Sequence, residues 1–259
     1  MSKITLTKKE KEEYGVNEET LREFLLAKAI LNELRTHEFE EAEKVELSYI
    51  TDVEKVKFYI AKRLEGRINI TEETITEVYT ANKKYFDDQK IAFTEARDII
   101  GQDLVNQQVQ QLENEEIFGI VNEMENNIEL TKQEILYSNG DPTILRVMVT
   151  NKVVLKKAEK SGFNKENRKI LETIENNVLV NYYIDSKVRK VVRVTQEEIQ
   201  NEYNNQKENL KNIPSDQAYQ EVTNNLLMTR ATEERTKIIN EISRKYKVED
   251  VVKENFEEK

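Results

Sequence analysis

The stretch Leu6-Thr7-Lys8-Lys9-Glu10 returns as Leu130-Thr131-Lys132-Gln133-Glu134, shifted by 124 residues. Without a gap, the same shift pairs positions further along the chain: Leu21 with Leu145, Leu31 with Leu155, Phe39 with Phe163, Leu47 with Leu171, Tyr59-Ile60 with Tyr183-Ile184, Thr71 with Thr195 and Tyr79 with Tyr203. The register holds to Phe86 and Leu210 and then slips by a few residues. A match of this length predicts a tandem duplication, with one copy in residues 1–127 and the other in residues 128–259.

Each copy begins with the signals of two helices. Thr7 and Thr131 are each followed three residues later by Glu, the pattern of a capping box at a helix N-terminus. Asn17 and Asp141 are predicted to cap the second helix, and Pro142 stands at a first helical position, where its missing N–H costs nothing. The two copies are therefore expected to start alike.

Three further helices are predicted in each copy. A long third helix carries an apolar stripe at steps of three and four residues: Ala42, Val45, Tyr49, Val53, Val56, Ile60 and Leu64. Thr71 and Thr195 are predicted to cap the fourth helix, and the last and longest helix spans about residues 93–124 or 217–246. Roughly five helices per copy follow from these patterns.

Composition favours the same fold class. The chain has 6 Gly and 2 Pro in 259 residues, too few for the many tight turns of a sandwich, barrel or propeller. Charged residues make up 35% and apolar residues 37%, which suits thin cores between long amphipathic helices. We expect an all-α protein.

Charge and cysteine content exclude several classes of function. The formal net charge of −10 would repel a phosphate backbone, so nucleic acid is not an expected partner. The absence of Cys excludes disulfides, thiolate metal sites and cysteine nucleophiles. No apolar run is long enough to span a membrane, and the charged start of the chain predicts no signal peptide within it.

Catalytic and metal-binding patterns are also missing from the sequence. The single histidine, His37, is either a ligand together with Glu40 or Glu41 or a structural residue near a helix end, and the second interpretation is preferred. The glycines are too scattered to form a phosphate-binding loop, and the acidic run 38–46 lacks the Glu-x-x-His pairs of a di-metal bundle. We expect no enzyme activity and no cofactor.

Two local features leave alternatives open. The basic stretch 187–193 either contacts an anionic partner or complements the C-terminus of a helix, and the structural interpretation is preferred. Phe58-Tyr59 and Tyr182-Tyr183 are doublets of aromatic residues. The two rings of a doublet cannot both point into one narrow apolar face of a helix, because successive residues are 100° apart. One ring of each doublet either lies exposed as a contact surface or packs on a neighbouring helix. Client binding by Phe58, Tyr59, Tyr182 and Tyr183 is the functional prediction.

The second copy carries a family resemblance. Its run 145–163 ends in Ala158-Glu159-Lys160-Ser161-Gly162-Phe163, and it continues to Tyr182-Tyr183 and to Val194-Thr195-Gln196-Glu197-Glu198-Ile199 before Tyr203. These segments resemble the N-terminal helical module of SurA/PrsA-type extracytoplasmic chaperones and foldases. Many members of that family insert a parvulin-type prolyl isomerase domain before the final long helix, whereas here that junction is only the short segment 210–216.

The resemblance implies a chaperone without isomerase activity, acting without ATP on unfolded or partly folded polypeptides. It also implies a periplasmic or otherwise extracytoplasmic location, with the signal sequence absent from this chain; a cytoplasmic location is the alternative. A helical-repeat scaffold that binds one folded partner, or a homodimer, remains the second hypothesis. A sizeable apolar concavity would favour the chaperone.

Overall fold

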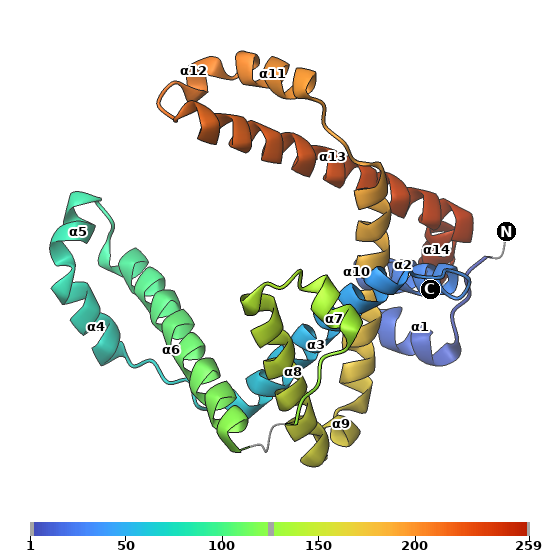
Figure 1. Ribbon diagram of the computed structural model, residues 1–259, viewed down its shortest axis with the longest axis horizontal. Helices are drawn as coiled ribbons and strands as arrows, with labels where there is room; N and C mark the ends of the chain where they lie inside the picture. The colour runs from blue at the N-terminus through green and yellow to red at the C-terminus, as the bar shows by residue number, and fades with distance from the viewer. Residues whose placement is uncertain (1–2, 124–126, 258–259) are drawn as a thin grey trace. The chain divides into compact units, whose positions relative to one another are not determined.

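The computed structural model describes residues 3–123 and 127–257, and every regular element in these ranges is a helix, so the prediction of an all-α protein is confirmed (Figure 1). The bounds of the helices are α1 Lys8–Tyr14, α2 Glu18–Leu34, α3 Glu41–Leu64, α4 Glu72–Ala81, α5 Lys83–Asp88, α6 Phe93–Glu123, α7 Lys132–Tyr137, α8 Pro142–Lys160, α9 Phe163–Glu166, α10 Arg168–Val191, α11 Gln196–Asn205, α12 Lys207–Leu210, α13 Ser215–Tyr246 and α14 Val248–Glu257.

The predicted N-caps are present. Thr7 and Thr131 each form a capping box with the Glu three residues later. The side chains of Thr71 and Thr195 both accept a hydrogen bond from the backbone N–H three residues on, so the prediction that both cap a helix is confirmed. Because each such cap is worth about 1 kcal/mol, the starts of these helices are determined locally by the sequence.

The compact units do not follow the predicted boundary at residue 127. Unit 1 combines Met1–Phe39 with Glu175–Lys259, and unit 2 is Glu40–Ile174. The first helical hairpin of the chain, α1–α2, thus belongs to a unit whose other helices lie after residue 174. The hairpin α7–α8 belongs to the unit that contains α3 to α6. Each unit therefore joins a hairpin from one half of the sequence to long helices from the other half.

In unit 1, α2 packs against α13 and α14. Leu21, Leu25, Ala29 and Ile30 of α2 are fully buried in one cluster with residues of α10, α13 and α14. Arg22 of α2 and Glu249 of α14 also form an exposed ion pair, whose closest atoms are 2.9 Å apart. Apolar burial on one face of α2 accordingly holds the hairpin.

In unit 2, α8 packs against α3 and α6. The core consists of Val56, Tyr59, Ile60 and Leu64 of α3, Ile120 of α6, and Val153, Val154 and Ala158 of α8. Most of the predicted stripe on α3 thus faces α6, α7 and α8. The α3 residues in this core lie in the last three turns of the helix.

The two hairpins make matching contacts at the 124-residue offset. Lys28 pairs with Glu10 on the first hairpin at 2.7 Å, and Lys152 pairs with Glu134 on the second at 2.8 Å. Within unit 1 the ring of Phe39 lies 5.6 Å from that of Tyr182, and within unit 2 Phe163 lies 5.4 Å from Phe58. These pairs correspond to each other across the two units.

Each unit also carries an arm with a small core of its own (Figure 1). In the first arm, α4 and α5 fold back on the start of α6 and bury Ile75, Phe86, Ala96 and Ile100. In the second arm, α11 and α12 do the same on α13 and bury Ile199, Leu210, Ala218 and Val222. On the second arm, hydrogen bonds from Arg230 hold the pKa of Glu198 at about 2.

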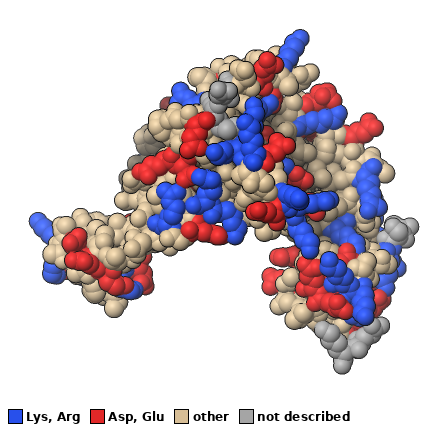
Figure 2. All heavy atoms as spheres, turned by 90° about the horizontal axis from the view of Figure 1, so that it is seen from below, with Lys and Arg blue, Asp and Glu red and all other residues tan. Residues whose placement is uncertain are grey.

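Charged side chains of both signs lie side by side over most of the face shown in Figure 2. Within residues 3–123 and 127–257, no helix combines the length and the apolar character that crossing a membrane requires.

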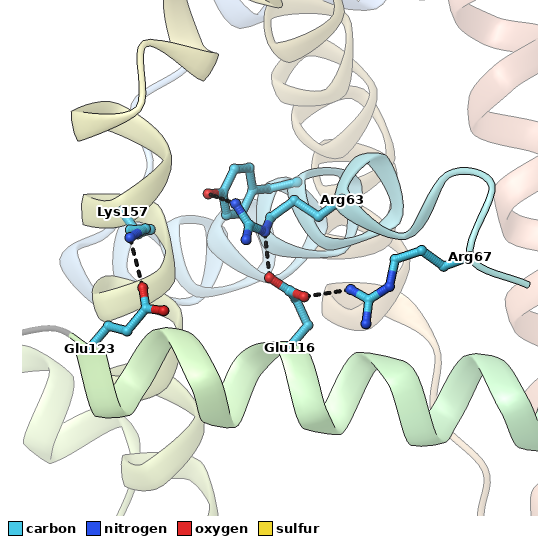
Figure 3. Close-up of polar contacts among 6 residues, drawn as sticks. Arg63, Arg67, Glu116, Glu123 and Lys157 are labelled. Carbon is cyan, nitrogen blue, oxygen red and sulfur yellow. Dashed lines mark hydrogen bonds and ion pairs between the residues drawn. The ribbon is translucent and has the colours of Figure 1, made fainter.

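A set of ion pairs fixes the second half of α6 in unit 2 (Figure 3). The carboxylate of Glu116 accepts hydrogen bonds from Arg63 at 2.5 Å and from Arg67 at 2.7 Å. About two turns further on, Glu123 pairs with Lys157 of α8 at 2.9 Å. These contacts define the point from which the first arm extends.

Replacing Glu116 with Gln is expected to lower the free energy of unfolding at neutral pH by about 1 kcal/mol, because both charged hydrogen bonds are weakened. Burial alone would raise the pKa of Glu116, but the hydrogen bonds from Arg63 and Arg67 prevail and lower it. The stabilisation is thus present above the ordinary pKa of Glu and disappears as the pH falls through the lowered pKa. Urea unfolding of the wild type and the variant at pH 7 and at about pH 3 measures this.

The matched control is Glu115→Gln, which changes an exposed neighbour on the same helix. It should alter the free energy of unfolding by no more than about 0.5 kcal/mol at either pH. Equal losses in the two variants would contradict a specific role of Glu116.

Candidate functional site

The four aromatic residues predicted to bind clients do not form an exposed surface. Tyr59, Tyr182 and Tyr183 are buried, and Phe58 is half-buried. Of the two alternatives for the doublets, packing on neighbouring helices holds for Tyr182-Tyr183, since both rings are buried. A role of these residues in client binding stays a prediction. In the structure they pack against other aromatic rings.

That packing role is to fasten the chain beyond each hairpin to a long helix. In unit 2 the ring of Phe163 contacts both Phe58 and Tyr59, the latter at 4.8 Å between ring centroids. In unit 1 Phe39 contacts Tyr182, and the adjacent His37 contacts Tyr183 at 5.1 Å. Both rings of Tyr182-Tyr183 are buried because Phe39 contacts one of them and His37 contacts the other.

His37 lies among aromatic rings rather than among ligands. Its ring meets Phe39 and Tyr183 edge to face, and its buried Nε2 has no hydrogen-bond partner. Glu40 closes the capping box of α3, and Glu41 pairs with Lys44. Among the described residues, no group of three or more His, Cys, Asp or Glu is placed to hold a metal ion. The structural interpretation of His37 fits these contacts.

The basic stretch 187–193 is engaged with its own helix. The ammonium of Lys187 lies over the ring of Tyr183 at 4.8 Å, and the guanidinium of Arg189 lies over Tyr182 at 5.2 Å. Arg193 donates to the carbonyl oxygens of Arg189 and Val192 at the end of α10. The preferred interpretation, in which cations complement a helix C-terminus, fits this geometry.

An apolar groove lies elsewhere in unit 2, between α7 and the first turns of α3. It has a volume of about 270 Å³ and is lined by Glu41, Ala42, Val45, Gln133, Leu136 and Tyr137. The ring of Tyr137 stacks at an angle on Tyr49 of α3, with centroids 5.8 Å apart. We call this feature the α3–α7 groove.

Two large apolar side chains of α7 are exposed to solvent, and one of them, Leu136, lines the α3–α7 groove. Leu136 is 67% exposed and Ile135 is 50% exposed. At the 124-residue offset, the corresponding positions of α1 are Lys11 and Glu12. Helix α1 has the same cap and the same ion pair to its partner helix without apolar residues at these positions. The hairpin α7–α8 therefore does not need Ile135 and Leu136 in order to fold. Ile135 and Leu136 are thus candidates for contact with another molecule.

Three local features hold α7 in place. Its N-terminus is fixed by the capping box of Thr131 and Glu134, and Lys152 of α8 pairs with Glu134. Its C-terminus turns through Asn139 and Gly140, both at positive φ, into the cap of α8. The α7 wall of the groove is therefore part of a hairpin held by local contacts.

A polar cavity of about 10 Å³ lies beneath the groove and shares Val45 with it. Tyr49, Asp52 and Asn151 also line it, and Nδ2 of Asn151 has no hydrogen-bond partner. Burial raises the pKa of Asp52, against the nearby charges of Lys55 and Lys152. A single water molecule fits a space of this size, and polar groups of this kind would bind it.

A second exposed apolar surface lies at the end of the first arm. Tyr79, Tyr85, Phe86 and Phe93 form a chain of ring contacts there, with Phe86 buried. Tyr85 remains 59% exposed and Phe93 42% exposed. The turn between α5 and α6 includes Lys90 at a φ of 58°. We call this feature the arm-tip cluster.

Comparison with protein-family models, with curated proteins and with solved structures finds no match to this chain.

Proposed function

We propose that this protein is an ATP-independent, chaperone-like protein that binds apolar segments of unfolded or partly folded polypeptides. The observation that supports this function is the α3–α7 groove, lined by the exposed Leu136, together with the exposed Ile135 on the same helix. Apolar side chains in that position can pack against a client segment, whereas the equivalent Lys11 and Glu12 cannot. The resemblance to SurA/PrsA-type chaperones, an extracytoplasmic location and the absence of isomerase activity belong to the same proposal.

The size of the groove favours weak and reversible binding. Covering the exposed parts of Ile135 and Leu136 contributes about 1–2 kcal/mol for each side chain. The entropy lost on association offsets much of this gain, so a single groove of this kind holds a client briefly. The arm-tip cluster offers a second apolar contact in the same unit, and several weak contacts suit a chaperone that releases clients without ATP.

The second candidate function is a scaffold that binds one folded partner. It is favoured by the bracing of α7, because a preformed groove suits a partner of fixed shape. The two functions differ in the state of the protein that is bound, and an assay with the same client in native and unfolded form distinguishes them.

The test replaces the exposed residues of α7 with those that α1 carries, as the double variant Ile135→Lys and Leu136→Glu. We expect this variant to lose most of the suppression of aggregation that the wild type gives to a chemically unfolded client. Its free energy of unfolding should change by no more than about 0.5 kcal/mol, because both positions are exposed. Light scattering of the diluted client measures the first quantity, and urea unfolding measures the second.

The control is the double variant Ile170→Lys and Val191→Glu, which makes the same chemical changes at two exposed apolar positions of α10. It should retain suppression. If both variants suppress aggregation as the wild type does, the α3–α7 groove is not the binding site. If the wild type shows no suppression at a severalfold excess over client, the scaffold function becomes the leading candidate.

A further inference from the structure

The polar cavity beneath the α3–α7 groove contains polar side chains that the matching positions of the chain do not provide. Asp52 of α3 and Asn151 of α8 both line this cavity. At the 124-residue offset, the corresponding residues are Asn176 and Ala27. The Lys–Glu pair that braces each hairpin forms in both cases. Packing of the hairpin α7–α8 therefore does not require Asp52 and Asn151.

Asn151 has an unused hydrogen-bond donor. The residue is 6% exposed, and its Nδ2 has no hydrogen-bond partner among the described residues. A buried donor without a partner is costly, and an ordered water molecule commonly satisfies such a group. The cavity of about 10 Å³ has room for one water molecule. A water that accepts from Nδ2 of Asn151 can donate to oxygen atoms of Asp52 and Tyr49, which line the same cavity.

The charged groups that face Asp52 come from three helices. Lys55 lies on α3 itself, Glu134 lies on α7, and Lys152 lies on α8. Lys152 already pairs with Glu134, with the closest atoms 2.8 Å apart. Burial, aided by the charge of Glu134, outweighs the two lysines and raises the pKa of Asp52. The folded protein therefore favours the neutral form of Asp52 more than the unfolded chain does.

We propose that one water molecule in this cavity links Asn151 to Asp52, and that ionisation of Asp52 loosens the hold of the hairpin α7–α8 on α3. The ionised Asp52 places a second carboxylate near Glu134, so that both compete for Lys152, which braces α7. Because α7 forms one wall of the α3–α7 groove, the pH then controls how firmly that wall is held.

The direction of the pH effect follows from the raised pKa. Below the ordinary pKa of Asp, about 3.9, the carboxyl is neutral in the folded and in the unfolded chain. As the pH rises, the unfolded chain ionises first, and stability is lost until the pH exceeds the raised pKa of Asp52. Above that pKa the loss is complete and constant.

The experiment is amide hydrogen exchange on the full chain, with the wild type compared with Asp52→Asn at about pH 7 and at about pH 3. The reporters are Ile135 and Ser138, whose N–H groups donate to backbone carbonyl oxygens at 3.1 and 3.0 Å. At pH 7 their protection factors should be at least about threefold higher in Asp52→Asn, because the amide cannot ionise. At pH 3 the two proteins should match.

Two controls localise the effect. The amide of Ile75 in the first arm donates to a backbone carbonyl oxygen at 3.1 Å, and its protection should not change. Asp103→Asn removes the same charge at an exposed position of α6, and it should leave the protection of Ile135 and Ser138 unchanged. An equal gain in Asp103→Asn would make net charge the cause and would overturn the proposal. Unchanged protection in Asp52→Asn at both pH values, or lower protection at both, would overturn it as well.

The link through water is tested separately with Asn151→Ala, which introduces the residue found at the matching position 27. At pH 7 this change should lower the protection of Ile135 and Ser138 by a larger factor in the wild type than in Asp52→Asn. The reason is that only the wild type then loses a hydrogen-bonded bridge to a charged group. Equal factors in the two backgrounds would show that Asn151 and Asp52 act independently, and the water link would be refuted.

Discussion

A fragment comprising residues 40–174 is expected to fold on its own, whereas a fragment comprising residues 1–127 is expected to be largely unfolded or aggregated. The first fragment is unit 2, in which α3, α6 and α8 share one core. The second contains α1–α2 without the helices of unit 1, and α3 without α8. Far-UV circular dichroism and urea unfolding of both fragments measure the difference.

The expected effect is large. In residues 1–127, Leu21, Leu25, Ala29 and Ile30 lose the helices that bury them, and Ile60 of α3 loses its contact with α8. Burial of each large apolar side chain contributes about 1.5–3 kcal/mol. Losing several of them removes as much free energy as stabilises a whole domain, about 5–15 kcal/mol.

The alternative is that α1–α2 takes the place of α7–α8 within the short fragment. At the 124-residue offset, Leu34 would then stand where Ala158 is buried in the core of unit 2. A side chain three carbons larger in a filled core costs about 1–3 kcal/mol. A cooperative, monomeric 1–127 fragment as stable as 40–174 would contradict this argument and would show that the hairpins are interchangeable.

The helices could be predicted from the sequence because their signals are local. Thr71 and Thr195 need only the backbone N–H three residues on to act as caps, and both do. The long helices near 93–123 and 215–246 were likewise expected from their stripes. The short helices α5, α9, α12 and α14 were not predicted. Helices α5 and α12 have no side-chain cap, and a single turn after Gly162 and a helix beginning directly after Lys247 have no strong start signal.

The partner of each hairpin could not be predicted in the same way. If the first and second hairpins have similar sequences, either one fits either set of long helices by pattern alone. The choice depends on connections and side-chain volumes that appear only in three dimensions. The predicted boundary at residue 127 follows the sequence match at the 124-residue offset, whereas each compact unit combines a hairpin and long helices from opposite sides of that boundary.

The candidate site was missed although the sequence contains a signal for it. Aromatic doublets suggest a contact surface because aromatic residues are often exposed at interfaces, but here Phe39 and Phe163 pack against them. The stronger signal is the difference at the 124-residue offset, where Ile135 and Leu136 correspond to Lys11 and Glu12. An apolar residue in one repeat at a position that is charged in the other points to a role other than folding.

Truncating a buried doublet ring is expected to destabilise the protein strongly. The side chain of Tyr183 is 3% exposed and belongs to the core of unit 1, so Tyr183→Ala should lower the free energy of unfolding of that unit by about 3 kcal/mol or more. The substitution would leave a cavity and would also remove the ring that His37 and Lys187 contact. Urea unfolding followed by circular dichroism measures the loss.

The matched control is Tyr85→Ala in the arm-tip cluster, which removes the same side chain at an exposed position. Its effect on the free energy of unfolding should stay within about 0.5 kcal/mol. Any loss of client holding in Tyr183→Ala would then follow from unfolding of unit 1, whereas a loss in Tyr85→Ala would report a surface contact. Full stability of Tyr183→Ala combined with a loss of client holding would instead support direct client binding by the doublet, because only a ring that is not packed in the core can be removed without a loss of stability.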